Sequence, residues 1–180
     1  GSATMPQSTP GGTVFFGGNS LTTGNDNNVV SNCDIGSASP SINLPAKGVC
    51  ILGTTTSTST NNSGDTIRNC NIYNYFSGSV SSAGVFLGAG TRDITVKDNK
   101  FYMDSSQTGG PFNNHSAIMV VNSSGSNYMI SGNTIGASSS SGSGTYSLNG
   151  GSNFSFYAIL LIVNDTAASN VQNNIIKNIS

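Results

Sequence analysis

Apolar residues recur in a fixed six-residue pattern along this chain of 180 residues. The pattern can be written (V/I)-x-(N/D/G)-(N/C)-x-(I/F), with large apolar residues at its first and last positions. We call it the corner motif, and its five copies are Val30–Ile35, Ile67–Ile72, Val96–Phe101, Ile130–Ile135 and Val171–Ile176. Repetition every 20 to 50 residues or so indicates stacked structural repeats. The sequence therefore predicts that the apolar ends of the five copies share one core.

The third position of the corner motif holds only Asn, Asp or Gly. These residues accept the left-handed backbone conformation most readily. The motif therefore predicts a tight corner between two short strands, with the fourth residue turned inward beside the corner.

A second apolar element keeps similar spacing. Its copies are Thr13–Phe16, Gly48–Leu52, Gly84–Leu87, Ser116–Val121 and Tyr157–Val163. Each repeat would then have one strand from this element and two from the corner motif, paired in parallel with their equivalents. Continuous apolar runs are typical of parallel strands buried on both faces, and Ala158–Val163 is such a run. No segment shows helical periodicity over two turns.

Length variation falls in three connections rich in Ser, Thr and Gly, at residues 53–65, 107–114 and 137–153. We expect them to be loops that act as spacers, although loops on such scaffolds also carry functional contacts. Residues 1–12 are expected to be an irregular lead-in that begins with a cloning remnant, Gly1-Ser2, and residues 13–180 one repeat domain. Because the last corner motif runs directly into the end of the chain, we expect further repeats, a capping domain or another chain to cover that end.

The corner motif, especially Ser131–Ile135 and Asn173–Ile176, resembles the repeat of right-handed parallel β-helices, the pectin-lyase-like fold. The resemblance implies an all-β, single-stranded parallel β-helix, a solenoid of about five rungs with no substantial helix. In that family an inward Asn forms a hydrogen-bonded ladder along the stack. The matching positions here, a structural ladder, are Cys33, Cys70, Asn99, Asn133 and Asn174.

Cys33 and Cys70 occupy equivalent positions in consecutive repeats, so we expect them about 4.8 Å apart. Two buried thiols are the expected arrangement, because buried Cys acts as a small apolar residue. A disulfide between them is the alternative, but parallel side-chain directions make its geometry awkward. A zinc site would need more ligands than Cys33, Cys70 and the one His provide.

Charge is scarce: 7% of residues are charged and the net charge is -1. So few charges argue against the clustered basic residues of a nucleic-acid-binding protein. They also argue against electrostatic binding to anionic membranes. The longest apolar run, Tyr157–Val163, has the length of a strand, so no membrane insertion is expected. A surface made of Ser, Thr, Asn and Gly is common in secreted β-rich proteins, which predicts an extracellular or cell-surface location.

Catalytic signatures of the family are missing. Its hydrolases carry an Asp-Asp pair, a Gly-His-Gly and an Arg-Ile-Lys, and none of these occurs in the sequence. Its lyases bind calcium through clustered acidic residues, whereas the seven aspartates of this chain are scattered. No cofactor is therefore expected, and no calcium site is evident. The one histidine, His115, is interpreted as a hydrogen-bonding surface residue, not a catalytic base.

Carbohydrate is the ligand that the aromatic residues favour. Tyr73 and Tyr102 follow consecutive corner motifs, so we expect their rings to project from one outer face and to stack on sugars. Arg68 and Lys97 share the second motif position, so two cations would lie one above the other. The positions of the tyrosines would be explained equally well if their rings packed under a loop. The positions of the cations would be explained equally well if they were solvated residues at the edge of a sheet. Tyr75 and Tyr128 also flank corner strands and could extend an exposed row of rings.

Three functions are compatible with the sequence. The favoured one is a noncatalytic extracellular module, structural or adhesive, with weak carbohydrate binding. The alternatives are a fragment of a polysaccharide lyase or glycoside hydrolase, and a trimeric module like those of phage tailspikes. Scarce charge and the absence of acid pairs favour the first, and glycans are the expected partners.

Overall fold

Fifteen strands in the described part of the chain form three parallel sheets of five strands each. The structure is a computed structural model that describes residues 12–18, 22–39, 44–109, 113–150 and 154–180. Nearly all of the expected lead-in, residues 1–11, lies outside these ranges. Within them the chain is all-β with parallel pairing, and its one helical piece is a 3-10 turn, η1, at Thr58–Thr60. The predicted fold class is therefore confirmed at the level of parallel β-sheets.

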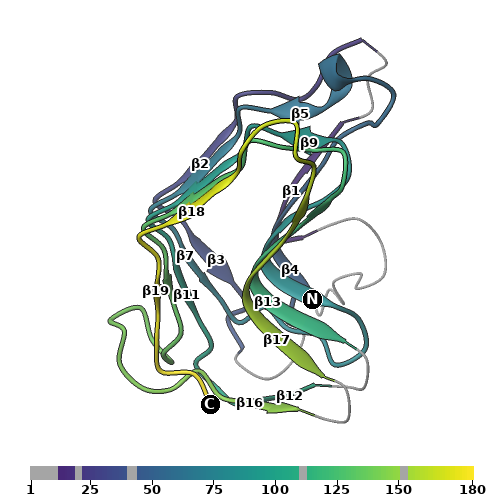
Figure 1. The fold of residues 1–180 in the computed structure, drawn as a ribbon. Helices are drawn as coiled ribbons and strands as arrows, with labels where there is room; N and C mark the ends of the chain where they lie inside the picture. Colours follow the sequence, from purple (N-terminus) through teal and green to yellow (C-terminus); the bar gives the residue numbers. More distant parts are fainter. Residues whose placement is uncertain (1–11, 19–21, 40–43, 110–112, 151–153) are drawn as a thin grey trace.

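The first sheet contains the strands of the second apolar element. Their order across the sheet is β1 (Val14–Gly17), β4 (Lys47–Leu52), β8 (Ser82–Leu87), β13 (Asn114–Asn122) and β17 (Ser155–Val163). Each strand pairs with the equivalent strand one repeat earlier or later, so sequence order and spatial order coincide (Figure 1).

The second and third sheets contain the two halves of the corner motifs. The second is ordered β2 (Val29–Ser31), β6 (Thr66–Arg68), β10 (Thr95–Lys97), β14 (Met129–Ser131) and β18 (Asn170–Gln172). The third is ordered β3 (Asp34–Gly36), β7 (Asn71–Tyr73), β11 (Lys100–Tyr102), β15 (Thr134–Ile135) and β19 (Ile175–Ile176). The chain passes through the three sheets in the same order five times.

The register places equivalent motif positions beside one another. In the first sheet Val14 pairs with Val49, and Val85 pairs with both Val49 and Ile118. In the second sheet the first positions of the corner motif are register partners: Val30, Ile67, Val96, Ile130 and Val171. In the third sheet the last positions are register partners: Ile35, Ile72, Phe101, Ile135 and Ile176. The apolar ends of the first four copies are buried in one core cluster, as the pattern predicted, whereas Val171 and Ile176 of the fifth copy are exposed.

The predicted corners adopt the left-handed conformation. The third motif positions have φ values of 57°, 54°, 56°, 67° and 56° at Asn32, Asn69, Asp98, Gly132 and Asn173. A Cβ at Gly132 would stand 2.3 Å from Oδ1 of Asp98 in the preceding repeat, so a side chain here would displace that carboxylate. The corner prediction is confirmed in all five copies.

Two predictions about the fold are wrong. The run Ala158–Val163 is only half-buried and Ile162 is 48% exposed, because β17 is an edge strand with a partner on one side only. The connections expected to be spacer loops also contain paired strands: β5 (Asn62–Ser63) pairs with β9 (Thr91–Arg92), and β12 (Gln107–Gly109) with β16 (Leu148–Gly150). Residues 110–112 and 151–153 of these connections lie outside the described residues.

Candidate functional site

Tyr73 and Tyr102 form a stacked pair on the outer face of the third sheet. They are register partners on β7 and β11, their ring centroids are 5.0 Å apart, and the ring planes differ by 4°. Both residues are half-buried. The pairing of two parallel strands aligns these side chains, because residues at equivalent positions project in the same direction. The result is a continuous aromatic surface that spans two repeats.

Carboxylates flank this aromatic surface. Burial raises the pKa of the Tyr102 phenol to about 12, and the nearby Tyr73, Asp34 and Asp104 add to the shift. Asp34 accepts a hydrogen bond from Nδ2 of Asn71 at 2.6 Å, and Asp104 accepts one from Nδ2 of Asn74 at 3.1 Å. The phenol therefore stays protonated at neutral pH and lies near groups that can accept hydroxyl protons.

Arg68 and Lys97 lie on a different sheet from the tyrosines. The two cations are register partners on β6 and β10 of the second sheet, as their shared motif position predicted. The tyrosines follow the corner, on β7 and β11 of the third sheet. The four candidate binding residues therefore form two pairs on two sheets and are not one cluster.

A cleft lies beside Tyr102 on the third sheet. Its volume is about 120 Å³, and its lining residues are Lys100, Tyr102, Thr134, Gly136, Ser139, Ser140, Ser141, Gly142 and Lys177. The segment after β15 folds back over β11 and β19 to form one wall (Figure 1). Within this wall the backbone amides of Ser138 and Gly142 donate to the carbonyls of Ser143 and Ser139 at 3.0 Å.

Two lysines face this cleft from opposite parts of the chain. Nζ of Lys100 donates to the carbonyl oxygen of Ser140 at 2.8 Å, and Nζ of Lys177 lies against Gly142. Neither lysine was predicted to be a site residue. Lys100 belongs to the third corner motif and Lys177 directly follows the fifth, which places both at the third sheet, but only the folded-back segment reveals the shared cleft.

The ladder asparagines are joined to one another in the core. Asn133 accepts from the backbone amide and Nδ2 of Asn99 at 3.0 and 3.1 Å, and Asn174 accepts from the same two groups of Asn133 at 3.0 and 2.9 Å. Nδ2 of each also donates to a carbonyl one repeat earlier, at Ile67, Val96 and Ile130. All of these bonds lie within the protein. Asn99 and Asn133 are also buried, so neither has a free polar group to offer a ligand.

The expectation of two buried cysteines is wrong for Cys33. Cys70 is buried and burial raises its pKa, but Cys33 is exposed. The difference follows from position: β2 and β3 are the edge strands of their sheets, so no repeat covers the Cys33 side of the stack within the described residues. No disulfide joins the two thiols.

His115 is buried, which contradicts its interpretation as a surface residue. It lies on β13 with 0% exposure, between the hydroxyls of Ser82 and Tyr146, each 2.7 Å from a ring nitrogen. Tyr146 in turn donates to the hydroxyl of Tyr75 at 3.1 Å. Because the Tyr146 proton is used in that bond, Nε2 of His115 donates to Tyr146 and Nδ1 accepts from Ser82. Burial lowers the pKa of His115 to about 3, so the ring is neutral.

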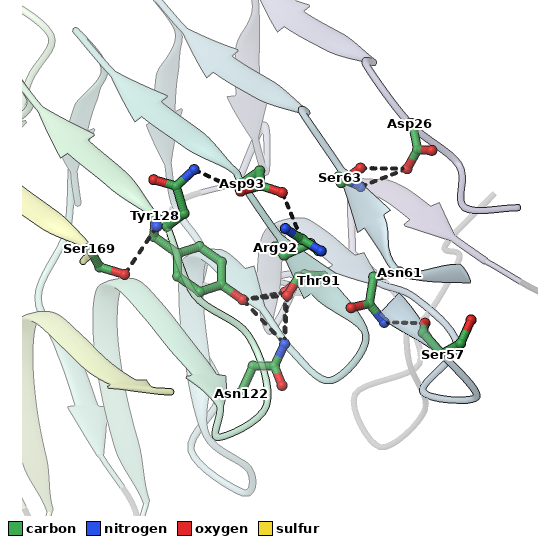
Figure 2. A network of polar contacts seen from close by, with 11 residues as sticks. Asp26, Ser57, Asn61, Ser63, Thr91, Arg92, Asp93, Asn122, Tyr128 and Ser169 are labelled. Carbon is green, nitrogen blue, oxygen red and sulfur yellow. Dashed lines mark hydrogen bonds and ion pairs between the residues drawn. The ribbon is translucent and has the colours of Figure 1, made fainter. Parts of the chain in front are cut away.

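Two of the tyrosines considered for an exposed row are also buried. Tyr75 is 0% exposed and packs edge-on against Phe101, while Tyr128 is 1% exposed. Figure 2 shows Tyr128 and Asn122 pointing toward Thr91: the Tyr128 hydroxyl and Nδ2 of Asn122 each donate to the Thr91 carbonyl at 2.7 Å. Tyrosine has an apolar ring and a polar hydroxyl, so it can be buried where the hydroxyl forms a hydrogen bond. Both hydroxyls have such a partner in the core.

Three further carboxylates lie away from the tyrosine pair and interact within the protein. Asp65 is fully buried, its Oδ2 has no hydrogen-bond partner, and burial raises its pKa. Asp93 forms an ion pair with Arg92 at 2.7 Å, and Asp26 accepts from Ser63 (Figure 2). Among the described residues no three His, Cys, Asp or Glu side chains are grouped closely enough to hold a metal ion.

Comparison with known proteins gave no relative. No family model matches the chain, and neither a curated protein nor a solved structure matches it. Among the described residues no helix has the length and apolar character needed to cross a bilayer. The site's own geometry is therefore the basis for a functional proposal.

Proposed function

We propose that the chain is part of a right-handed parallel β-helix of about five rungs that serves as a noncatalytic extracellular or cell-surface module with weak carbohydrate affinity. The repeated passage through three parallel sheets supports the β-helix. The stacked Tyr73–Tyr102 pair is the observation that carries the binding function.

An aromatic surface with flanking carboxylates has the chemistry of a sugar-binding site. The apolar face of a sugar ring packs against aromatic rings, and its hydroxyls need acceptors as well as donors. Tyr73 and Tyr102 provide about two repeats of ring surface, and Asp34 and Asp104 provide acceptors nearby. Both rings are half-buried, so a sugar would contact only part of each ring, which favours weak binding.

The positions of the titratable groups favour binding over catalysis. A general acid needs a raised pKa and contact with the substrate. Asp65 has the raised pKa, but its unpaired oxygen is buried. His115 is also buried. A lyase or hydrolase would have to use other groups.

The test is a glycan array followed by titration of the best ligand. Tyr73→Ala and Tyr102→Ala should each weaken binding about fivefold or more, consistent with ~1 kcal/mol per aromatic contact. Tyr157→Ala is the matched control, since Tyr157 is 38% exposed but lies on the first sheet. The proposal is overturned if no glycan binds, if the tyrosine variants bind as the wild type does, or if the protein cleaves the bound glycan.

A further inference from the structure

The cleft beside Tyr102 has an excess of hydrogen-bond donors. Two ammonium groups, from Lys100 and Lys177, face it together with the hydroxyl of Thr134, and none of its lining residues is acidic. The hydroxyls of Ser139 and Ser141 also line it and are hydrogen-bonded to each other at 2.9 Å. The chain has six cations in all, so a third of them meet at this one cleft. A neutral sugar hydroxyl both donates and accepts, whereas an oxyanion only accepts. This lining therefore matches an oxyanion better than a neutral sugar.

Lys100 is held in position by the wall of the cleft and retains donors for a ligand. Nζ of Lys100 uses one of its three protons on the Ser140 carbonyl at 2.8 Å. Lys177 directly follows β19, the next-but-one strand after β11 in the third sheet, so its stem starts about 10 Å further along the stack. Nδ2 of Asn178 donates to the Gly142 carbonyl at 3.3 Å and ties the wall to the end of β19. Ammonium groups thus approach the cleft from two sides.

The size of the cleft limits the ligand to one substituent group. Its volume of about 120 Å³ is below the roughly 300–1,000 Å³ of pockets that enclose a whole small molecule. Gly136 lies beside Tyr102 by the register of β11 with β15, and both residues line the cleft. A sugar stacked on the tyrosines can therefore direct one substituent into the cleft.

We propose that this cleft binds a sulfate ester carried by a saccharide that stacks on Tyr73 and Tyr102. A sulfate ester has three terminal oxygens that point in different directions, which suits donors on two lysines and on the serine wall. The two oxygens of a carboxylate lie in one plane and can meet fewer of them. The saccharide part of this inference rests on the proposed carbohydrate binding, but the anion site does not depend on it.

The first experiment uses inorganic sulfate and the intact chain. Wild-type protein titrated with sodium sulfate should show saturable amide shifts at residues 136–142 by NMR, weakened by added sodium chloride because the charges are exposed. Lys100→Gln with Lys177→Gln should weaken sulfate binding about tenfold or more. Lys47→Gln is the charge-matched control, since Lys47 lies over the Phe86 ring on the first sheet. Equal sulfate binding by the double variant and the wild type would overturn the site.

The second experiment compares one oligosaccharide in sulfated, carboxylated and neutral forms. The sulfated form should bind the wild type about tenfold more tightly than the neutral form, and this preference should vanish in the double lysine variant while neutral binding persists. Neutral binding without a sulfate preference would overturn this inference and leave the proposed function intact. Tighter binding of the carboxylated form would overturn the assignment of sulfate. Sulfate binding by a protein that binds no oligosaccharide would support the anion site and overturn the carbohydrate function.

Discussion

Asn99 donates both its backbone amide and its side-chain Nδ2 to Oδ1 of Asn133, at 3.0 and 3.1 Å. One oxygen therefore satisfies two buried donors of the preceding repeat. The same geometry recurs between Asn133 and Asn174. Because the three asparagines come from corner motifs 34 and 41 residues apart, these bonds tie successive repeats together along the core.

Asn133→Ala should lower the free energy of unfolding by about 3 kcal/mol or more. The substitution removes the acceptor for two buried donors of Asn99, and each unsatisfied buried group costs about 1–3 kcal/mol. Urea unfolding followed by circular dichroism measures the change. Asn174→Ala is the control and should cost clearly less, because Asn174 is half-buried and water can replace its oxygen. Equal losses in the two variants would contradict a core role for the ladder.

Asn69→Ala should be less stable than Asn69→Gly by about 1 kcal/mol. Asn69 is exposed and has a φ of 54°, and a left-handed backbone costs an alanine roughly 1–2 kcal/mol. Both variants lose the same amide side chain, so their difference isolates the backbone conformation. Thermal unfolding of the pair is the measurement. Alanine equal to or more stable than glycine would mean that this corner is not left-handed in solution.

Stability should fall with acid in a window set by His115. Its folded pKa is about 3 and its ordinary value about 6.5, so the unfolded chain binds a proton that the folded protein does not between these values. The contribution is complete above pH ~6.5 and is lost progressively as the pH falls toward ~3, with a full size on the order of 4 kcal/mol. Tyr75 and Tyr146, which face the ring, do not titrate in this window, since burial raises the pKa of both.

His115→Gln provides the comparison for this pH dependence. The variant should be less stable at pH 7, because the aromatic contacts of the ring with Tyr75 and Phe76 are lost. Its urea midpoint should change less than that of the wild type between pH 7 and pH 4. The same slope in both proteins would show that His115 is accessible to protons in the folded state.

One thiol should react quickly with a water-soluble reagent in the native protein. Cys33 is exposed, whereas Cys50 and Cys70 are buried, and burial raises the Cys70 pKa and so lowers its thiolate fraction. Native labelling followed by mass spectrometry should give a single adduct that disappears in Cys33→Ser. Labelling in denaturant should give three adducts. Rapid labelling of Cys70 in the native protein would contradict its burial.

Several features followed from the sequence alone. The strands, their parallel partners and the register could be predicted because a residue pattern repeated five times records which positions are equivalent. Left-handed corners at Asn32, Asn69 and Asp98 could be predicted because few residue types accept that backbone. The pairing of Tyr73 with Tyr102 followed for the same reason, since both come directly after a corner motif.

Tertiary structure alone decided the rest. The Ser- and Gly-rich segment after β15 has no apolar period, so nothing in its sequence indicated that it would fold back and bring the Ser140 carbonyl to Lys100. His115 is buried because Tyr75 and Tyr146, 40 and 31 residues away in sequence, close around it. Exposure of Cys33 and Ile162 depends on which strands lie at the edges of the sheets. A repeating pattern fixes what lies beside each strand, whereas burial and hydrogen bonding depend on everything else that surrounds a side chain.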